Sequence, residues 1–141
     1  MLDELSELWD ELRLYQLERS TDFKWHYESF TFHDRKKPLL LCADRGKLFI
    51  VIAYHDGVKI GYCISSVVDG VGEIESIYVK TDYRKQNIGN GLMSKSIEWI
   101  KTYDVRKVMV KVVTGNEDAM GFYSRFGFKP RFTDMQLTFG R

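Results

Sequence analysis

The first 18 residues carry apolar side chains at intervals of three and four. Such spacing places one apolar stripe along a helix, with polar residues on its other faces. The pattern therefore predicts an amphipathic helix over residues 2–18 that packs on the rest of the chain. The stripe consists of Leu2, Leu5, Leu8, Trp9, Leu12 and Tyr15.

The following segment, residues 22–35, is aromatic and mixed in polarity. It predicts a second helix or an irregular lid. Pro38 lacks an amide hydrogen and is expected to interrupt whatever follows before the short run LLLCAD.

From residue 47 the hydrophobic pattern becomes that of strands. Three runs, KLFIVIAYH, VKIGYCISSVV and EIESIYVK, are rich in Ile, Val and Tyr. The dipeptides Asp56-Gly57 and Asp69-Gly70 separate them, and Asp-Gly favours tight hairpin turns. Three consecutive antiparallel strands are expected.

Helical spacing returns over residues 87–103 and is followed by the apolar run VRKVMVKVV. A strand, a helix and a strand in series are typical of parallel neighbours in one sheet. Residues 116–125 predict a short helix that ends at Gly127, and FKPRFTDMQLTF predicts one or two last strands. The whole pattern indicates an α+β fold, with a mixed, mostly antiparallel sheet flanked by helices.

Length and charge narrow the class of protein. A chain of 141 residues suits one domain, and 21 basic against 20 acidic residues leave no continuous basic face for nucleic acid. Cys42 and Cys63 lack metal-type spacing with His, which suits reduced thiols in the cytoplasm and no metal site. The acidic N-terminus and the absence of an 18-residue apolar run predict neither secretion nor a membrane span.

The stretch YRKQNIGNGLM, residues 83–93, has glycines and asparagines where a helix begins. A helix N-terminus has unpaired amide groups and a positive dipole end, so this turn can bind an anion. Gly89 and Gly91 allow close approach of a ligand, Asn87 tolerates a left-handed backbone, and Arg84 and Lys85 add positive charge. Together these residues suit a diphosphate; the alternative is a tight turn whose glycines ease the packing of helix on strand, and the turn alone does not decide between them.

Two common nucleotide motifs do not fit this turn. A P-loop ends in Gly-Lys-Ser/Thr, and a dinucleotide fingerprint lies in a repeated parallel unit with a downstream acid. The longer stretch IYVKTDYRKQNIGNGLM instead resembles the acyl-coenzyme A motif of the GNAT superfamily of N-acetyltransferases, Arg/Gln-x-x-Gly-x-Gly/Ala. Gln86-x-x-Gly89-x-Gly91 satisfies it literally. We prefer the register that begins at Arg84 and puts Asn87 where glycine is usual.

A later block, residues 116–128, resembles the family's Asn-x-x-Ala-x-x-Phe-Tyr-x-x-x-Gly-Phe pattern. On a helix, Asn116, Ala119 and Tyr123 would share one face, with Ala119 leaving room for a ligand. A core position for Tyr123 is the alternative. The resemblance covers residues 47–131, the first helix is similar too, and the family's usual strand before that helix is missing. The edges thus left, with TDMQLTF, could pair two copies in a homodimer.

The resemblance implies one GNAT-like domain over residues 1–141 with a splayed central sheet. It also implies transfer of an acetyl group from acetyl-CoA to a primary amine of a small molecule or peptide, by direct attack in a ternary complex. A non-catalytic acyl-CoA-binding module is the alternative function, and a plain interaction domain with a fortuitous loop is a third.

Acetyl transfer needs a neutral amine, so a base is required. Glu73 and Glu75 are the candidates, and strand alternation puts both on the face of Ile77 and Val79 unless a bulge intervenes. The resemblance favours Glu73; either carboxylate could also simply face solvent. The three histidines are expected to be surface or packing residues, although one from the aromatic N-terminal segment could enter an acceptor pocket.

The resemblance further implies roles for backbone and side chains. The Ile77 amide would polarise the thioester carbonyl, Val79 would pair with pantetheine, Tyr123 would protonate the leaving thiolate, and Asn116 would hold pantetheine or a water. Residues 20–35 could bind a cationic acceptor through aromatic rings and carboxylates, or could simply cover the sheet. The remaining expected contacts with the cosubstrate are Arg84, Lys85, Gln86, Asn87, Ile88, Gly89, Asn90 and Gly91.

Overall fold

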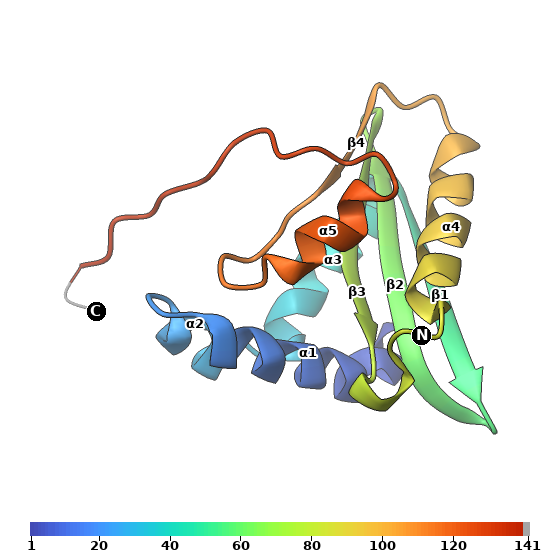
Figure 1. The fold of residues 1–141 in the computed structure, drawn as a ribbon. Coiled ribbons are helices and arrows are strands. Elements are labelled where there is room, and N and C mark those ends of the chain that lie inside the picture. The colour runs from blue at the N-terminus through green and yellow to red at the C-terminus, as the bar shows by residue number, and fades with distance from the viewer. Residues whose placement is uncertain (140–141) are drawn as a thin grey trace.

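The computed structural model describes residues 1–139 and has one four-stranded sheet between two layers of helices (Figure 1). The strands lie in the order β1-β2-β3-β4. The first three are antiparallel neighbours, and β4 runs parallel to β3, as the sequence predicts. Their bounds are Lys47–His55 for β1, Val58–Val68 for β2, Val71–Val79 for β3 and Lys107–Val110 for β4.

The two predicted hairpin turns are confirmed. Asp56 and Asp69 have φ values of 49° and 50°, and the glycines that follow have 78° and 75°. Two successive residues with positive φ match the right-handed twist of the flanking strands, and Asp-Gly adopts this conformation at low cost. These turns set the register of β1, β2 and β3.

The helices that precede the sheet in sequence cover one of its faces (Figure 1). Their buried leucines and Trp9 pack on Tyr62, Ile64 and Tyr78 of the sheet. The predicted apolar stripe of the first helix thus forms the centre of this cluster, whose burial stabilises the fold. The elements are η1 (Leu2–Leu5), α1 (Ser6–Arg19), α2 (Lys24–Ser29) and α3 (Phe32–Arg45).

The later helices share a second apolar cluster with the opposite face of the sheet. Leu92, Met93 and Ile100 of α4 pack there with Cys63 and Ile74. Phe122 and Tyr123 of α5 join the same cluster, so both helices are held against the strands that flank the site. The elements are η2 (Thr81–Tyr83), α4 (Ile88–Lys101) and α5 (Asp118–Ser124).

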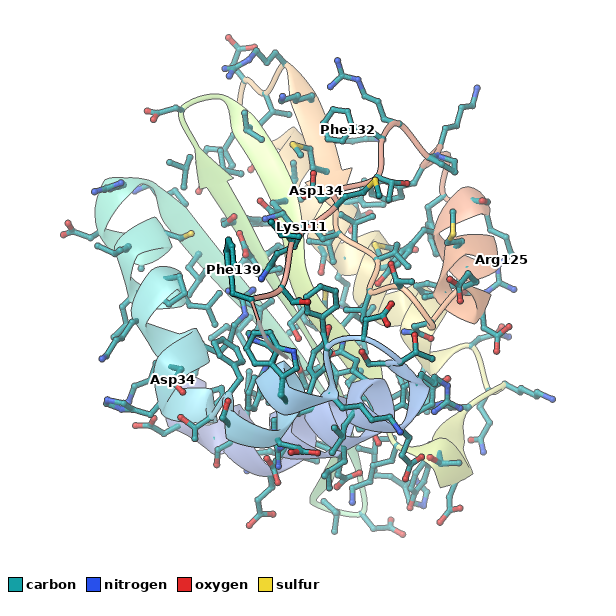
Figure 2. The ribbon with its side chains drawn as sticks, turned by 90° about the vertical axis from the view of Figure 1, so that its left-hand side faces the viewer. Asp34, Lys111, Arg125, Phe132, Asp134 and Phe139 are labelled. Atoms are coloured by element: carbon teal, nitrogen blue, oxygen red, sulfur yellow. The ribbon has the colours of Figure 1, made fainter. Side chains whose placement is uncertain are left out.

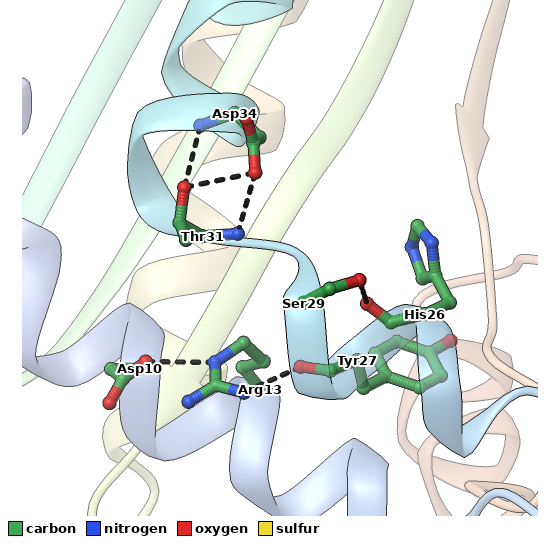
Figure 3. Close-up of polar contacts among 7 residues, drawn as sticks. All are labelled: Asp10, Arg13, His26, Tyr27, Ser29, Thr31 and Asp34. Carbon is green, nitrogen blue, oxygen red and sulfur yellow. Dashed lines mark hydrogen bonds and ion pairs between the residues drawn. The ribbon is translucent and has the colours of Figure 1, made fainter.

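The expected interruption at Pro38 was wrong, because α3 runs through this residue. A capping box stabilises the start of this helix: Thr31 Oγ1 accepts from the Asp34 amide at 3.2 Å, and Asp34 accepts from the Thr31 amide at 2.9 Å (Figure 3). Burial of Leu39 anchors the next turn. Tertiary packing therefore overrides the local signal.

The strands predicted for FKPRFTDMQLTF were also wrong within the described residues. This segment is irregular and runs away from the sheet (Figure 1), and the β4 strand is shorter than the run VRKVMVKVV. The alternating apolar residues of the segment 128–139 have no neighbouring strand within the described residues, so Met135, Leu137 and Phe139 are 94%, 76% and 85% exposed. Phe132 and Phe139 project from this segment in Figure 2. A strand pattern alone does not supply a pairing partner.

Within residues 1–139, no helix combines the length and the apolar character needed to cross a membrane. Over residues 1–139, no group of three or more His, Cys, Asp or Glu side chains is placed to hold a metal ion.

Candidate active site

The sheet opens between β3 and β4. Their pairing ends at Ile74 and Val110, whereas β3 continues to Val79 without a neighbour on that side. A cleft of about 360 Å³ extends from this fork to the start of α4, and a smaller cavity of about 70 Å³ lies at the fork itself. Asn116, Ala119 and Tyr123 line both, together with Leu12 of α1.

A β-bulge lies at the fork. Ile64 of β2 pairs with Ser76 and the next residue, Ser65, pairs with Ile74, so Glu75 is the extra residue of β3. The bulge brings Ile74 and Ile77 into the same apolar cluster on the α4 side. Glu75 instead reaches Arg35 on the α3 side. The expectation that both glutamates share a face with Ile77 and Val79 holds only without a bulge, and the observed bulge shows that it was wrong.

The backbone of β3 beyond the bulge points its polar groups into the cleft at alternate residues. The Lys80 amide donates to the Ile60 carbonyl of β2 at 2.8 Å. Successive residues of a strand direct their amide and carbonyl groups to opposite sides, so the amides of Ile77 and Val79 point away from β2, toward the open fork. The Val79 carbonyl accepts from Arg84 Nε at 3.0 Å, which agrees with this direction. The fork thus presents backbone donors to whatever occupies it.

The turn before α4 has a second set of backbone donors. Lys85 and Asn87 both have positive φ, 64° and 63°, with Asn87 at the position where the preferred register has glycine. The first α-helical hydrogen bond runs from the Gly91 amide to the Asn87 carbonyl at 3.1 Å, and the Asn87 side chain does not cap the helix. The amides of Ile88, Gly89 and Asn90 therefore lack intrahelical acceptors at the positive end of a 14-residue helix.

The two glycines of this turn have different surroundings. A Cβ atom at Gly89 would lie 3.3 Å from Cε1 of Phe122, whereas at Gly91 it would meet nothing within 4 Å. Gly89 lines the cleft, and neither Gln86 nor Gly91 is among the lining residues. These observations favour the register that begins at Arg84. Nothing in the sequence predicted the positive φ of Lys85.

Basic residues outnumber acidic ones in the lining of the cleft. Lys85 and Arg125 line it together with Arg84, against a single acid, Asp118. The Arg84 guanidinium lies 4.8 Å from the ring centroid of Tyr15, which also lines the cleft. Tyr15 and Leu12 were predicted only as packing residues of the first helix, because an amphipathic stripe does not distinguish a core position from a cleft wall.

Tyr123 is the tyrosine that the structure places at the junction of the two cavities. It is 9% exposed, and its burial raises its pKa to about 12, with the nearby Cys63 adding to the shift. The phenol is thus neutral throughout the physiological range. Ala119 and Asn116 lie on the same wall, which brings the three predicted residues together.

Glu73 and Glu75 have different environments. Arg35 Nη2 lies 3.0 Å from Oε1 of Glu75, and Ser66 Oγ donates to Oε2 at 2.6 Å. Burial raises the pKa of Glu73, the negative charge of Glu75 raises it further, and Lys111 and Arg35 oppose the shift. Glu75 lines the smaller cavity, whereas Glu73 is not among the lining residues of either. Lys111 lies just beyond β4, close to the fork (Figure 2).

The helices α1 and α2 cover the α3 side of the site. Arg13 of α1 donates to the Tyr27 carbonyl of α2 and pairs with Asp10 at 2.8 Å (Figure 3). Phe30 and Phe32 pack on Trp9, with ring centroids 5.9 Å and 5.5 Å apart. These two aromatics therefore cover the sheet, and no residue of the described range 20–35 lines either cavity.

Comparison of the sequence with known protein families identifies the family of this chain. A family model described as "Acetyltransferase (GNAT) family" matches residues 5–128. The chain belongs to the GNAT acetyltransferase family. The predicted family and the predicted class of enzyme, an N-acetyltransferase, are thereby confirmed.

Curated relatives and solved structures agree with membership of the GNAT family. A Bacillus subtilis protein provisionally named ribosomal protein bS18-alanine N-acetyltransferase is 30% identical over 118 residues, which cover 83% of this chain and 73% of that protein. The chain spans 27% to 57% of the length of other curated relatives.

Among solved structures, the PaiA N-acetyltransferase of Thermoplasma acidophilum, in complex with coenzyme A, has a TM-score of 0.75 and 22% identity, covering 94% of this chain and 86% of that one. A Pyrococcus furiosus protein provisionally named an acetyltransferase has a TM-score of 0.74 and 20% identity, covering 97% and 93%. At this identity the likeness shows the fold, which confirms the predicted GNAT-like α+β class.

Proposed function

We propose that this GNAT protein transfers the acetyl group of acetyl-CoA to a primary amine by direct attack in a ternary complex. The observation that carries the proposal is the fork between β3 and β4. It joins outward-facing strand amides to the unpaired amides of α4 through one continuous cleft. A thioester arm and a diphosphate need these two kinds of donor, one at each end of the cleft.

The diphosphate would lie on the turn before α4. The amides of Ile88, Gly89 and Asn90 would donate to its oxygens, the left-handed Asn87 would shape the turn, and Lys85 would add charge. Arg84 would act mainly by fixing the turn to β3, because its Nε is bonded to the Val79 carbonyl. Gln86 and Gly91, which do not line the cleft, would support the turn without touching the ligand.

The pantetheine arm would extend along β3 toward the fork. The Val79 amide would pair with it as a neighbouring strand does, and Asn116 would hold it from the opposite wall. The Ile77 amide would donate to the thioester oxygen, where negative charge develops as the amine attacks. The reacting carbon would then lie next to Tyr123.

The amine must lose a proton before or during attack. An alkylamine of pKa about 10.4 is neutral only about once in 2,500 molecules at pH 7, a penalty of about 4.6 kcal/mol. We assign the base to Glu73 because it makes no ion pair within residues 1–139. Since Glu73 lines neither cavity, it would act through a water molecule. Its raised pKa makes it a stronger base than an exposed glutamate.

In the bond-making step, nitrogen bonds to the carbonyl carbon, the carbon–sulfur bond breaks, and coenzyme A leaves as a thiolate. A phenol of pKa about 12 gives its proton to a thiolate, whose thiol form has a pKa of about 8.5, only at a cost of about 5 kcal/mol. Tyr123 would therefore stabilise the thiolate chiefly as a hydrogen-bond donor. The proton that finally reaches sulfur would come from solvent.

The acceptor would present its amine at the smaller cavity, beside Lys111 and Gln16. Similarity to the Bacillus subtilis relative makes the α-amine of a protein N-terminus the first acceptor to test. Such an amine has a pKa of about 7.7 to 8.0 and is far more often neutral at pH 7 than a lysine amine. Its deprotonation by Glu73 therefore costs less free energy. Small-molecule amines are the second class.

The test is thiol release from acetyl-CoA in the presence of N-terminal peptides, polyamines, aminoglycosides and amino acids. Acetylation of at least one acceptor, with one thiol released per product, is expected. Saturable binding of coenzyme A without release for any acceptor would contradict the proposal and favour a non-catalytic acyl-CoA-binding module. Cytoplasmic location and the homodimer stay predictions.

A further inference from the structure

A polar network lies on the α3 side of the fork. Arg35 Nη2 donates to the Glu75 backbone carbonyl at 2.9 Å and to its carboxylate at 3.0 Å. Ser66 Oγ donates to the other carboxylate oxygen at 2.6 Å. The side chains of Arg35 and Glu75 are only 20% and 9% exposed, so one guanidinium holds both the backbone and the side chain of a single residue in a partly dry environment.

Glu75, the residue that Arg35 holds, is the extra residue of the β-bulge. Ile74 is the last residue of β3 that pairs with β4, and Glu75 is the extra residue that follows it. The Arg35 contact with the Glu75 carbonyl therefore fixes the backbone at the point where β3 leaves β4. The direction of the Ile77 amide, two residues further on, depends on this point.

The network also determines which of the two carboxylates, Glu73 or Glu75, is available to accept a proton. Glu73 lies opposite Ser66 in the register, on the same side of β3 as the side chain of Glu75. The charged or titratable groups that act on Glu73 are Glu75 from its own strand, Arg35 and Cys42 from α3, and Lys111 from the segment after β4. Arg35 neutralises Glu75 by direct contact, which leaves Glu73 as the carboxylate without an ion-pair partner in residues 1–139.

We propose that Arg35 is a positioning residue for acyl transfer: it holds the Glu75 bulge that opens the fork, and it reserves Glu73 for the amine. The proposal rests on the proposed function, although half of it can be measured without turnover. Removing the positive charge should favour protonation of Glu73, because its repulsion by Glu75 is then no longer offset by Arg35.

The experiment compares Arg35→Met, Arg35→Lys and the matched control Lys36→Met. Lys36 is the next residue of α3 and pairs with Asp3 at 2.8 Å, but Asp3 is 77% exposed and neither residue lines the cleft or the smaller cavity. Carboxyl carbon NMR gives the titration midpoint of Glu73 in each protein, and the pH profile of kcat/KM for the acceptor gives its kinetic counterpart.

For Arg35→Met we expect the Glu73 midpoint and the acidic limb of the profile to move together to higher pH. We also expect kcat to fall about tenfold or more, with KM for acetyl-CoA within about twofold of wild type. Arg35→Lys should restore the midpoint but not kcat, since a lysine cannot bridge the carbonyl and the carboxylate in the same geometry. Lys36→Met should change neither.

The proposal would be overturned if the titration midpoint of Glu73 were unchanged in both Arg35 variants. It would also be overturned if a lower folded fraction explained the whole loss of activity while the pH profile of kcat/KM stayed unchanged. If Arg35→Met does not fold, Arg35→Lys still tests it through kcat. A wild-type protein that acetylates no acceptor contradicts the proposed function instead, while the NMR midpoints continue to report on Arg35.

Discussion

Glu73 and Glu75 are two residues apart on β3, and only the second is held in an ion pair by the described part of the chain. Arg35 and Ser66 occupy both carboxylate oxygens of Glu75. Glu73, with its raised pKa, keeps both of its oxygens for a proton or a water molecule. This difference is the reason that we propose Glu73, and not Glu75, as the general base.

The variant Glu73→Gln removes the base without changing the size of the side chain. We expect kcat/KM for the acceptor to fall by about 10²–10³, with the affinity for coenzyme A unchanged, because proton removal is lost and the cosubstrate contacts remain. Steady-state kinetics with calorimetry measures both. The matched control is Glu98→Gln on the exposed side of α4. A Glu73→Gln enzyme with wild-type kcat/KM would remove Glu73 from the mechanism.

The same variant should change the dependence of stability on pH. The pKa of Glu73 is raised in the folded state, so its protonated form is favoured there. Its contribution to stability is present at low pH and is lost as pH rises through the folded pKa. Glu73→Gln should therefore melt at a higher temperature than wild type at pH 7, with the difference disappearing near pH 4. A lower melting temperature at pH 7 would show that Glu73 stabilises the fold as a charged group.

The variant Tyr123→Phe removes the proposed donor to the thiolate. We expect kcat to fall about 10- to 100-fold, since one hydrogen bond to developing charge is lost in a buried site. An acetyl thioester of a more acidic thiol should recover much of the loss, because its thiolate needs less stabilisation. Single-turnover kinetics with both thioesters measures this. An equal loss for the two thioesters would assign Tyr123 to packing.

The two glycines of the turn should respond oppositely to added side chains. Gly91→Ala is expected to leave the Kd for coenzyme A within about twofold and to raise stability by about 0.5–1 kcal/mol, because alanine favours the helix and meets open space. Gly89→Val should weaken binding about tenfold or more through contact with Phe122. Calorimetry and urea unfolding measure the pair. The opposite ranking would support the register that begins at Gln86.

Gly115 links α1 to the loop before α5. Its φ is +101°, and an added Cβ would lie 2.2 Å from the Arg19 carbonyl oxygen. Gly115→Ala should therefore cost about 2 kcal/mol or more of unfolding free energy, since the backbone must shift. Gly121→Ala, in open space on α5, is the control and should be neutral or stabilising. Equal unfolding midpoints for the two variants would mean that α1 and this loop do not depend on the contact.

Periodicity predicted the elements that local rules determine. The apolar stripe of α1 and the Asp-Gly hairpins depend on side chains within a few residues of one another, and both are confirmed. The helix through Pro38 begins at a capping box that is local, Thr31 with Asp34. Its continuation past the proline accompanies burial of Leu39, which local signals do not report. The terminal strands required a neighbour at the open edge, and alternation from Met135 onward cannot supply one.

The candidate site shows the same division. The turn at Asn87 could be predicted because its residue types match its backbone. The bulge at Glu75 could not, since EIESIYVK alternates without a glycine or any other sign of an extra residue. The partnership of Arg35 with Glu75 joins residues 40 positions apart and arises only from the packing of α3 on the sheet.

The central claim is that the amides at the start of α4 bind the linked phosphates of coenzyme A. Amide NMR of the labelled protein, titrated with coenzyme A and separately with pantetheine, tests it most directly. The account predicts large shifts of the Ile88, Gly89 and Asn90 amides with coenzyme A and small ones with pantetheine. Saturable binding of coenzyme A that leaves these three amides unmoved would contradict it.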